Sequence, residues 1–158
     1  MPDVVSGGKG SRREVARDGA CERIIPSDCQ EARRLQDDIE LALRGHGFDE
    51  RELFCIRLAL EEALVNAIKH GNQMDRSKKV HIQYRITSER FEVSISDEGC
   101  GFDPEDVPDP MEAENIERCS GRGLLLMRHY MTDVVFHAPG NRVRMVKLRN
   151  CTNGNGTC

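Results

Sequence analysis

Three polar side chains recur at helical spacing in the otherwise apolar stretch LALEEALVNAIKHGNQ, residues 58–73. They are Glu62, Asn66 and His70. Residues four apart lie on one face of a helix, so these three would form a polar stripe. Small residues such as Ala59 precede the stripe on the same row and leave room beside a carboxylate, as a ligand site requires. A water-bridged stripe at a helix end explains the same pattern, and the row by itself does not decide between the two.

The segment DEGCG, residues 97–101, follows a strand pattern in which apolar residues alternate from position 91 to position 95. Continuing that alternation puts Asp97 on the buried face, where an unpaired carboxylate is costly and needs a donor. Alternatively, Asp97 caps the turn that follows the strand. Gly99 and Gly101 allow the backbone to approach a bound group closely or to adopt positive φ.

The segment SGRGL, residues 120–124, directly precedes a second apolar helical pattern. Gly121 and Gly123 at a helix N-terminus would expose N–H groups at the positive end of the helix dipole, which makes a seat for phosphate. Arg118 and Arg122 could add positive charge there. A flexible lid hinge accounts for the two glycines equally well, since a lone G-x-G is weak evidence.

The elements around these motifs alternate between the two periodicities of secondary structure. We expect, in chain order, a strand at 21–26, a helix at 27–44, a long helix from 49 to 71, strands at 80–86 and 91–97, a long loop at 102–120, a helix at 121–131 and a final hairpin around 139–141. Strands joined by tight turns pair antiparallel. The order therefore predicts an α/β (α+β) two-layer sandwich, with helices over one face of a mixed, mostly antiparallel sheet.

Two capping boxes are expected to start the first two helices. Ser27 with Gln30 would begin one, and Asp49 with Glu52 would begin the other, which ends at Gly71.

Two other polar residues of the long helix are expected to have structural roles. Glu61 shares a row with Arg57, so we expect the two to form an ion pair at the solvent side. His70 lies near the helix end, where a partly positive imidazole would cap the C-terminus.

Length and composition bound the class of protein. The chain has 158 residues, 38% of them hydrophobic and 32% charged, without Trp, and this predicts one soluble domain with an aliphatic core. We expect an arm at 1–19, the domain at 20–149 and a tail at 150–158. No run approaches the roughly 20 apolar residues that cross a bilayer, so no membrane partner is expected.

Charge and cysteine usage narrow the partners. A net charge of -4 argues against nucleic acid as a partner, because phosphates require a basic surface. The seven cysteines form no C-x-x-C pair, which favours free thiols in a cytoplasmic protein over zinc binding. A bridge between Cys151 and Cys158 is geometrically possible, but the same argument disfavours it.

The order of EALVN on a helix, DEGCG after a strand and GRGL at a helix start resembles the N, G1 and G2 boxes of a known ATP-binding domain. Gyrase, heat-shock chaperones and sensor histidine kinases share this GHKL-type domain, the Bergerat fold. The resemblance covers roughly residues 20–149. The short ATP lid, the single-domain length and the run GRGLLLMRHYMTDV are most similar to bacterial anti-sigma factor serine/threonine kinases.

The resemblance implies a role for each matching residue. Glu62 would be the general base, Asn66 would bind Mg²⁺, and Asp97 would accept a hydrogen bond from the adenine amino group of ATP. The other positions implied to bind the nucleotide surround the adenosine or close the lid over the phosphates, with Arg118 near the terminal phosphate: Gly99, Gly101, Phe102, Arg118, Gly121, Arg122, Gly123 and Leu124.

By the same resemblance, the partners would be a sigma factor and a STAS-type anti-sigma factor antagonist, which the chain would phosphorylate on Ser or Thr. A homodimer is also implied as an option. Three alternatives stay open: a regulator that binds ATP without transferring phosphate, a stand-alone histidine-kinase-like ATPase domain, and a purely structural interaction domain. A stand-alone sensor-kinase domain is disfavoured because the 27–44 helix lacks the His that such a kinase phosphorylates.

Overall fold

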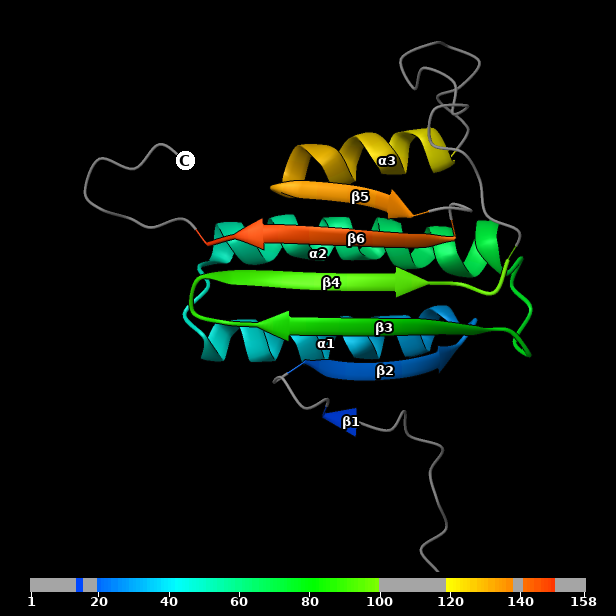
Figure 1. Ribbon diagram of the computed structural model, residues 1–158, viewed down its shortest axis with the longest axis horizontal. Helices are drawn as coiled ribbons and strands as arrows, with labels where there is room; N and C mark the ends of the chain where they lie inside the picture. Colours follow the sequence, from blue (N-terminus) through cyan, green and yellow to red (C-terminus); the bar gives the residue numbers. More distant parts are fainter. Residues whose placement is uncertain (1–13, 16–19, 100–118, 138–140, 150–158) are drawn as a thin grey trace, which may run out of the picture.

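Alternating apolar residues build a sheet that positions the candidate site at one of its ends. The computed structural model describes residues 14–15, 20–99, 119–137 and 141–149. The strands are β1 (Glu14–Val15), β2 (Cys21–Pro26), β3 (Lys79–Ile86), β4 (Arg90–Ser96), β5 (Asp133–His137) and β6 (Arg142–Leu148). They form a six-stranded sheet in the order β1-β2-β3-β4-β6-β5, and each of these neighbouring pairs is antiparallel (Figure 1).

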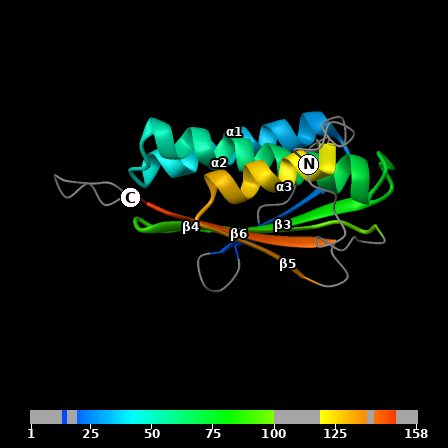
Figure 2. The same cartoon turned by 90° about the horizontal axis from the view of Figure 1, so that it is seen from above.

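Helices cover one face of this sheet, which confirms the predicted two-layer α/β sandwich. They are α1 (Cys29–Gly45), α2 (Glu50–Val65), the π-helix η1 (Asn66–Gly71) and α3 (Cys119–Tyr130). Seen from above, α1, α2 and α3 form one layer and the strands form the other (Figure 2). The expected N-terminal arm contains β1, which pairs with the start of β2. The other residues of the expected arm and the C-terminal tail lie outside the described part of the chain.

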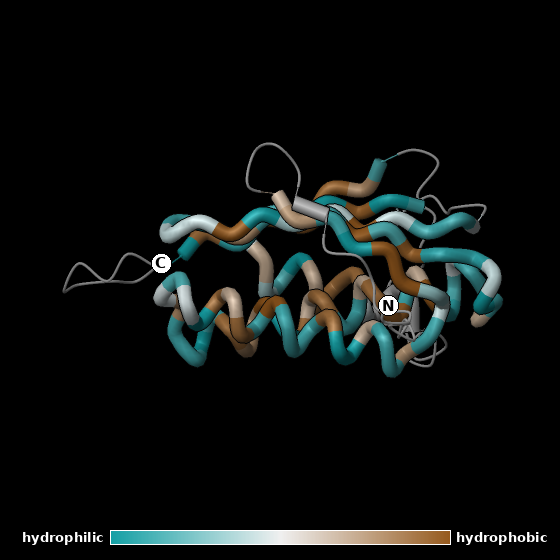
Figure 3. The backbone as a smooth tube through the Cα atoms, turned by 90° about the horizontal axis from the view of Figure 1, so that it is seen from below, coloured by the Kyte–Doolittle hydropathy of each residue, from teal (hydrophilic) through white to brown (hydrophobic). Residues whose placement is uncertain are grey.

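The core between the two layers is almost entirely aliphatic, as the composition predicts. Apolar turns of the helices face apolar strand residues, and polar turns face outward (Figure 3). The largest fully buried side chains are Ile25, Leu35, Ile39, Leu43, Ile56, Leu60, Leu64, Ile68, Ile82, Phe91, Ile95 and Met127. Each such side chain contributes about 1.5–3 kcal/mol by leaving water, so this layer holds α2 and η1 against β4.

The two predicted capping boxes have different outcomes. The box of Asp49 and Glu52 is confirmed, since each side chain accepts a hydrogen bond from the other residue's backbone N–H. The predicted cap at Ser27 is wrong by one residue: the N-cap of α1 is Asp28, which accepts from the N–H of Gln30 at 2.8 Å. Ser27 is buried instead, and its hydroxyl donates to the backbone carbonyl of Lys78.

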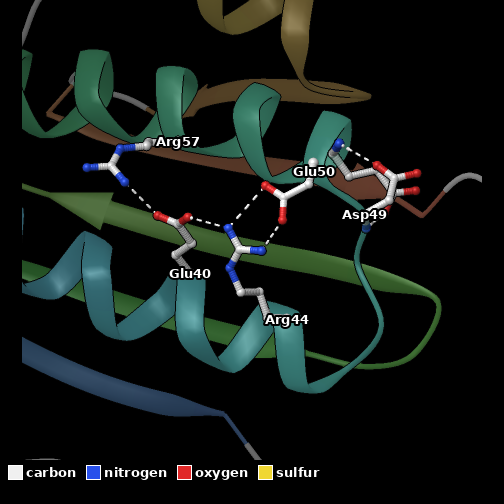
Figure 4. A network of polar contacts seen from close by, with 6 residues as sticks. Glu40, Arg44, Asp49, Glu50 and Arg57 are labelled. Atoms are coloured by element: carbon white, nitrogen blue, oxygen red, sulfur yellow. Dashed lines mark hydrogen bonds and ion pairs between the residues drawn. The ribbon is translucent and has the colours of Figure 1, made fainter.

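Charged side chains join α1 to α2, and they correct a second prediction. Arg57 pairs with Glu40 at 2.6 Å and with Asp37 at 3.7 Å, both on α1, and not with Glu61. Glu40 also accepts from Arg44, which reaches Glu50 at the start of α2 (Figure 4). Helical spacing allowed the local pair, but the neighbouring helix offers Arg57 two carboxylates.

The described residues contain neither a membrane-spanning helix nor a cluster of metal ligands. None of their helices has the length and apolarity needed to cross a membrane. No group of three or more metal-ligating side chains occurs among them. Cys21, Cys29 and Cys55 are free thiols, as expected, while Cys151 and Cys158 lie outside the described ranges.

The cap at Asp49 gives a stability prediction. Asp49→Ala removes the acceptor for the N–H of Glu52 and is expected to lower the free energy of unfolding by about 1 kcal/mol. Asp49→Asn keeps a capping oxygen and should cost only a few tenths of a kcal/mol. Urea unfolding measures both, and equal losses in the two variants would contradict a capping role.

Candidate functional site

The helix that carries the polar stripe changes its hydrogen bonding within the stripe. It is α-helical to Val65 and continues as a π-helix from Asn66 to Gly71. A π-helix closes its hydrogen-bonded turns one residue later than an α-helix, and single π-turns are frequent at functional sites. Glu62 and Asn66, on either side of this change, are both partly buried. His70 is exposed, and its expected interaction with the helix end stays a prediction.

A glycine of α3 lies directly against Glu62 and Asn66. A Cβ added at Gly123 would lie 2.8 Å from Oε2 of Glu62 and 3.2 Å from Nδ2 of Asn66. Glycine in a helix costs about 1 kcal/mol relative to alanine, so its presence here is explained by the close approach of α3 to α2. The structure thus brings the first and third motifs of the sequence together.

The side-chain amide of Asn66 is suited to bind an ion or a ligand. Its Oδ1 is buried and accepts no hydrogen bond from the residues that the structure describes. Leaving a buried acceptor unpaired costs about 1–3 kcal/mol, and such an atom in a native protein calls for an ion, a water or a ligand. An amide oxygen suits Mg²⁺, which commonly takes only one or two protein ligands beside waters and phosphates. Asn66 therefore fits the predicted metal role.

Asp97 follows β4 on the inward face, as the alternation predicts, and is half-buried. Its Oδ1 accepts from the N–H of Gly99 at 2.8 Å, so the turn-capping alternative is also correct. Among the described residues, this is the carboxylate's one hydrogen bond. Burial raises the pKa of Asp97, and the Gly99 N–H and nearby Lys78 oppose that rise. Within the described part of the chain, the carboxylate therefore has fewer donors than an ionised, half-buried group needs.

Two glycines, Gly71 and Gly99, lie directly against Asp97. A Cβ at Gly71 would overlap the Asp97 carboxylate, and a Cβ at Gly99 would overlap the carbonyl oxygen of Gly71. Sequence reasoning treated Gly71 only as the end of the helix and missed it as a site residue. The available signal was its place directly after the polar stripe. Its neighbour Asn72 was also missed: it is fully buried and hydrogen-bonds to the backbone N–H of Glu98.

The third motif lies differently from the prediction. Helix α3 begins at Cys119, so Gly121 and Gly123 lie inside its first turns and not ahead of it. Leu124 is buried in the core. The backbone of Arg122 is in α3, but its side chain is outside the described part of the chain. Gly101, Phe102 and Arg118 are also outside it, so the predicted nucleotide contacts of these residues stay predictions.

Comparison with known proteins identifies the family of this chain. A family model described as a histidine kinase-like ATPase domain matches residues 25–147. The chain belongs to that family. An ATPase domain uses ATP, so ATP is the nucleotide that the family implies for the site. The match includes each of the three motifs.

Individual relatives of this histidine kinase-like ATPase domain are named as kinases or anti-sigma factors. Serine-protein kinase RsbW of Bacillus subtilis is 32% identical over 67% of this chain and 69% of its own. RsbW of Listeria monocytogenes is 30% identical over 66% of this chain and 71% of its own. Anti-sigma F factor of Clostridium perfringens is 30% identical over 65% and 74%.

A solved structure of the RsbU and RsbW domains of a Mycobacterium tuberculosis protein is similar in fold. The TM-score is 0.56 at 14% identity, and the match covers 82% of this chain. This chain spans only 32% of that longer protein, so the likeness concerns the ATPase-domain fold alone.

The contact between Gly71 and Asp97 gives a second stability prediction. Gly71→Ala forces the carboxylate and the helix end apart, and is expected to lower the free energy of unfolding by about 1–3 kcal/mol. Gly45→Ala is the matched control, since a Cβ there meets nothing within 4 Å. It should be neutral or stabilising by up to about 1 kcal/mol. Similar denaturation midpoints for the two variants would contradict the close contact.

The raised pKa of Asp97 gives a pH prediction. The folded domain holds this proton to higher pH than the unfolded chain does, so ionisation of Asp97 lowers stability as pH rises above its ordinary pKa of 3.8. Asp97→Asn is therefore expected to raise the free energy of unfolding at neutral pH, and the gain should shrink in acid.

Asp75→Asn is the control of opposite sign. Hydrogen bonds from the Ser77 side chain and backbone lower the pKa of Asp75, so its ionised form stabilises the folded protein above the ordinary pKa. This variant should lose stability at neutral pH. Urea unfolding over a pH series measures both variants, and a neutral-pH loss in Asp97→Asn would contradict the assignment.

Proposed function

We propose that this chain is an ATP-binding anti-sigma factor serine/threonine kinase. It binds a sigma factor in the cytoplasm and phosphorylates a STAS-type anti-sigma factor antagonist. The observation that carries the proposal is the convergence of Gly123 on Glu62 and Asn66. It puts a carboxylate beside the start of α3, together with an amide oxygen that has no partner among the described residues. The names of the relatives, serine-protein kinase and anti-sigma F factor, support the substrate class and the partner.

Glu62 is the proposed general base. It accepts the proton of the attacking Ser or Thr hydroxyl while that oxygen bonds to the terminal phosphorus of ATP, and the phosphorus–oxygen bond to the leaving ADP breaks. A half-buried carboxylate beside α3 is suited to this role because it can face a bound phosphate and still be reached by a partner's side chain. Its position one turn before Asn66 keeps the base near the metal ligand.

Asn66 is the proposed ligand for Mg²⁺, which, when bound, would offset the charge of the phosphates. Its buried Oδ1 would gain in this way the partner that the described residues do not provide. Asp97 would accept from the exocyclic amino group of adenine. That interaction would add a second donor to the one that the described residues give its half-buried carboxylate, the Gly99 N–H.

Further residues are proposed to complete the nucleotide site. The positions proposed to flank the adenosine or to close over the phosphates are Gly99, Gly101, Phe102, Arg118, Gly121, Arg122, Gly123 and Leu124. Of these, Gly99 and Gly123 already lie against proposed site residues, Asp97 in one case and Glu62 with Asn66 in the other.

Transfer of labelled phosphate from ATP to a purified STAS-type antagonist tests the proposal. Glu62→Gln is expected to lower the transfer rate about 100-fold or more, because general-base catalysis contributes that much, while ATP affinity stays within a few-fold. Glu61→Gln is the matched control: the neighbouring side chain is exposed, so transfer should be unchanged. Asn66→Ala should remove the dependence of ATP binding on magnesium.

Two outcomes would change the proposal. Transfer at the native rate in Glu62→Gln would remove that residue as the base. Tight ATP binding by the native chain with no transfer to any antagonist would favour a regulator that uses ATP only to bind its partner. Isothermal titration with and without magnesium separates ATP binding from transfer.

A further inference from the structure

Asn72 is a fully buried amide directly after the helix end at Gly71. Its Oδ1 accepts from the backbone N–H of Glu98 at 2.8 Å, and its Nδ2 donates to the Lys79 carbonyl and to the Ser27 hydroxyl, each at 3.0 Å. These partners fix the orientation of the amide, because a backbone N–H only donates and a carbonyl only accepts. Asn72 thus ties the start of β3 to Ser27 and Glu98, which are distant from it in sequence.

The hydrogen bond to Glu98 acts on the peptide group that Asp97 shares with Glu98. The N–H of that peptide donates to Asn72, and its carbonyl accepts from Nδ2 of Asn141 at 3.1 Å. The N–H of Asp97 itself donates to the Asn141 carbonyl at 2.9 Å. Two asparagines therefore hold the backbone of Asp97 from opposite sides.

The sheet does not hold this residue by itself. Strand β4 ends at Ser96, whose partners in the neighbouring strands are His81 and Arg142. Beyond that point one backbone bond, from the Asp97 N–H to the Asn141 carbonyl, continues the pairing, and the side chains of Asn72 and Asn141 hold the peptide between Asp97 and Glu98. The direction of the Asp97 carboxylate relative to Gly71 depends on these bonds.

We infer that Asn72 and Asn141 are positioning residues that set the base selectivity of the nucleotide site through Asp97. The inference rests on the proposed function, in which Asp97 accepts from the adenine amino group. Adenine offers an amino donor at the position where guanine offers a carbonyl oxygen. A carboxylate held in one place accepts from adenine and repels guanine, whereas a carboxylate free to shift discriminates less.

The test compares ATP with GTP in isothermal titrations of the full chain in magnesium. The native chain is expected to prefer ATP. Asn72→Ala and Asn141→Ala should each lower the ratio of GTP to ATP dissociation constants by about tenfold, as expected for loss of a buried hydrogen bond. A variant that only lost folded protein would bind both nucleotides less, and the ratio would stay constant.

Ser27→Ala is the matched control. It removes one acceptor of Asn72 but leaves the bond to Glu98, so thermal stability should fall while the ratio stays native. Asn141 is only partly buried and lies outside the core, which keeps the test informative if Asn72→Ala does not fold. If a folded asparagine variant keeps the native ratio of GTP to ATP dissociation constants, the role of that asparagine is overturned. If Ser27→Ala lowers this ratio as much as the asparagine variants do, both positioning roles are overturned.

Failure of the proposed function has a different signature. If the native chain bound neither nucleotide, the proposed ATP site would fail and the inference would fall with it. If the native chain bound ATP and the variants kept the native ratio, only the positioning roles would be wrong.

Discussion

The end of η1 lies so close to the Asp97 carboxylate that no side chain fits between them, and the rest of the site depends on this contact. Only glycine at position 71 permits it, and Gly99 is constrained in turn because its Cβ would meet the carbonyl of Gly71. The aliphatic layer between the helices and the sheet fixes the separation of the two elements. The polar residues of α2 and the carboxylate after β4 are therefore held in a common frame.

Several residues of the candidate site lower the stability of the folded domain. Asn66 keeps a buried oxygen without a partner among the described residues, and burial raises the pKa of Asp97, so its ionised form is destabilising at neutral pH. Gly123 lowers the helix propensity of α3, but it allows α3 to approach α2 closely. These losses concentrate where a nucleotide and a metal ion are proposed to bind, whereas the capped helices and the core agree with local rules.

Local sequence patterns predicted the helices and strands well, but they predicted the contacts between distant elements poorly. Alternation predicted the strands β3 and β4, since inward residues share one face of a sheet. The cap at Asp49 followed from residues three apart. The predicted cap at Ser27 was wrong because a distant carbonyl uses that hydroxyl, and the predicted partner of Arg57 was wrong because α1 brings two carboxylates to it. In both cases the side chain interacts with a residue that is remote in sequence.

The sequence by itself determined that Glu62 and Asn66 share a helix face and that Asp97 points inward, because both follow from the periodicity of a single element. It also determined the order of three motifs that resembles an ATP-binding domain. Only the tertiary structure decided that His70 is exposed, that Gly71 and Gly123 are contact points, and that Asn72 and Asn141 hold Asp97. Those properties arise where elements far apart in the chain pack together, and no local spacing encodes such a distance.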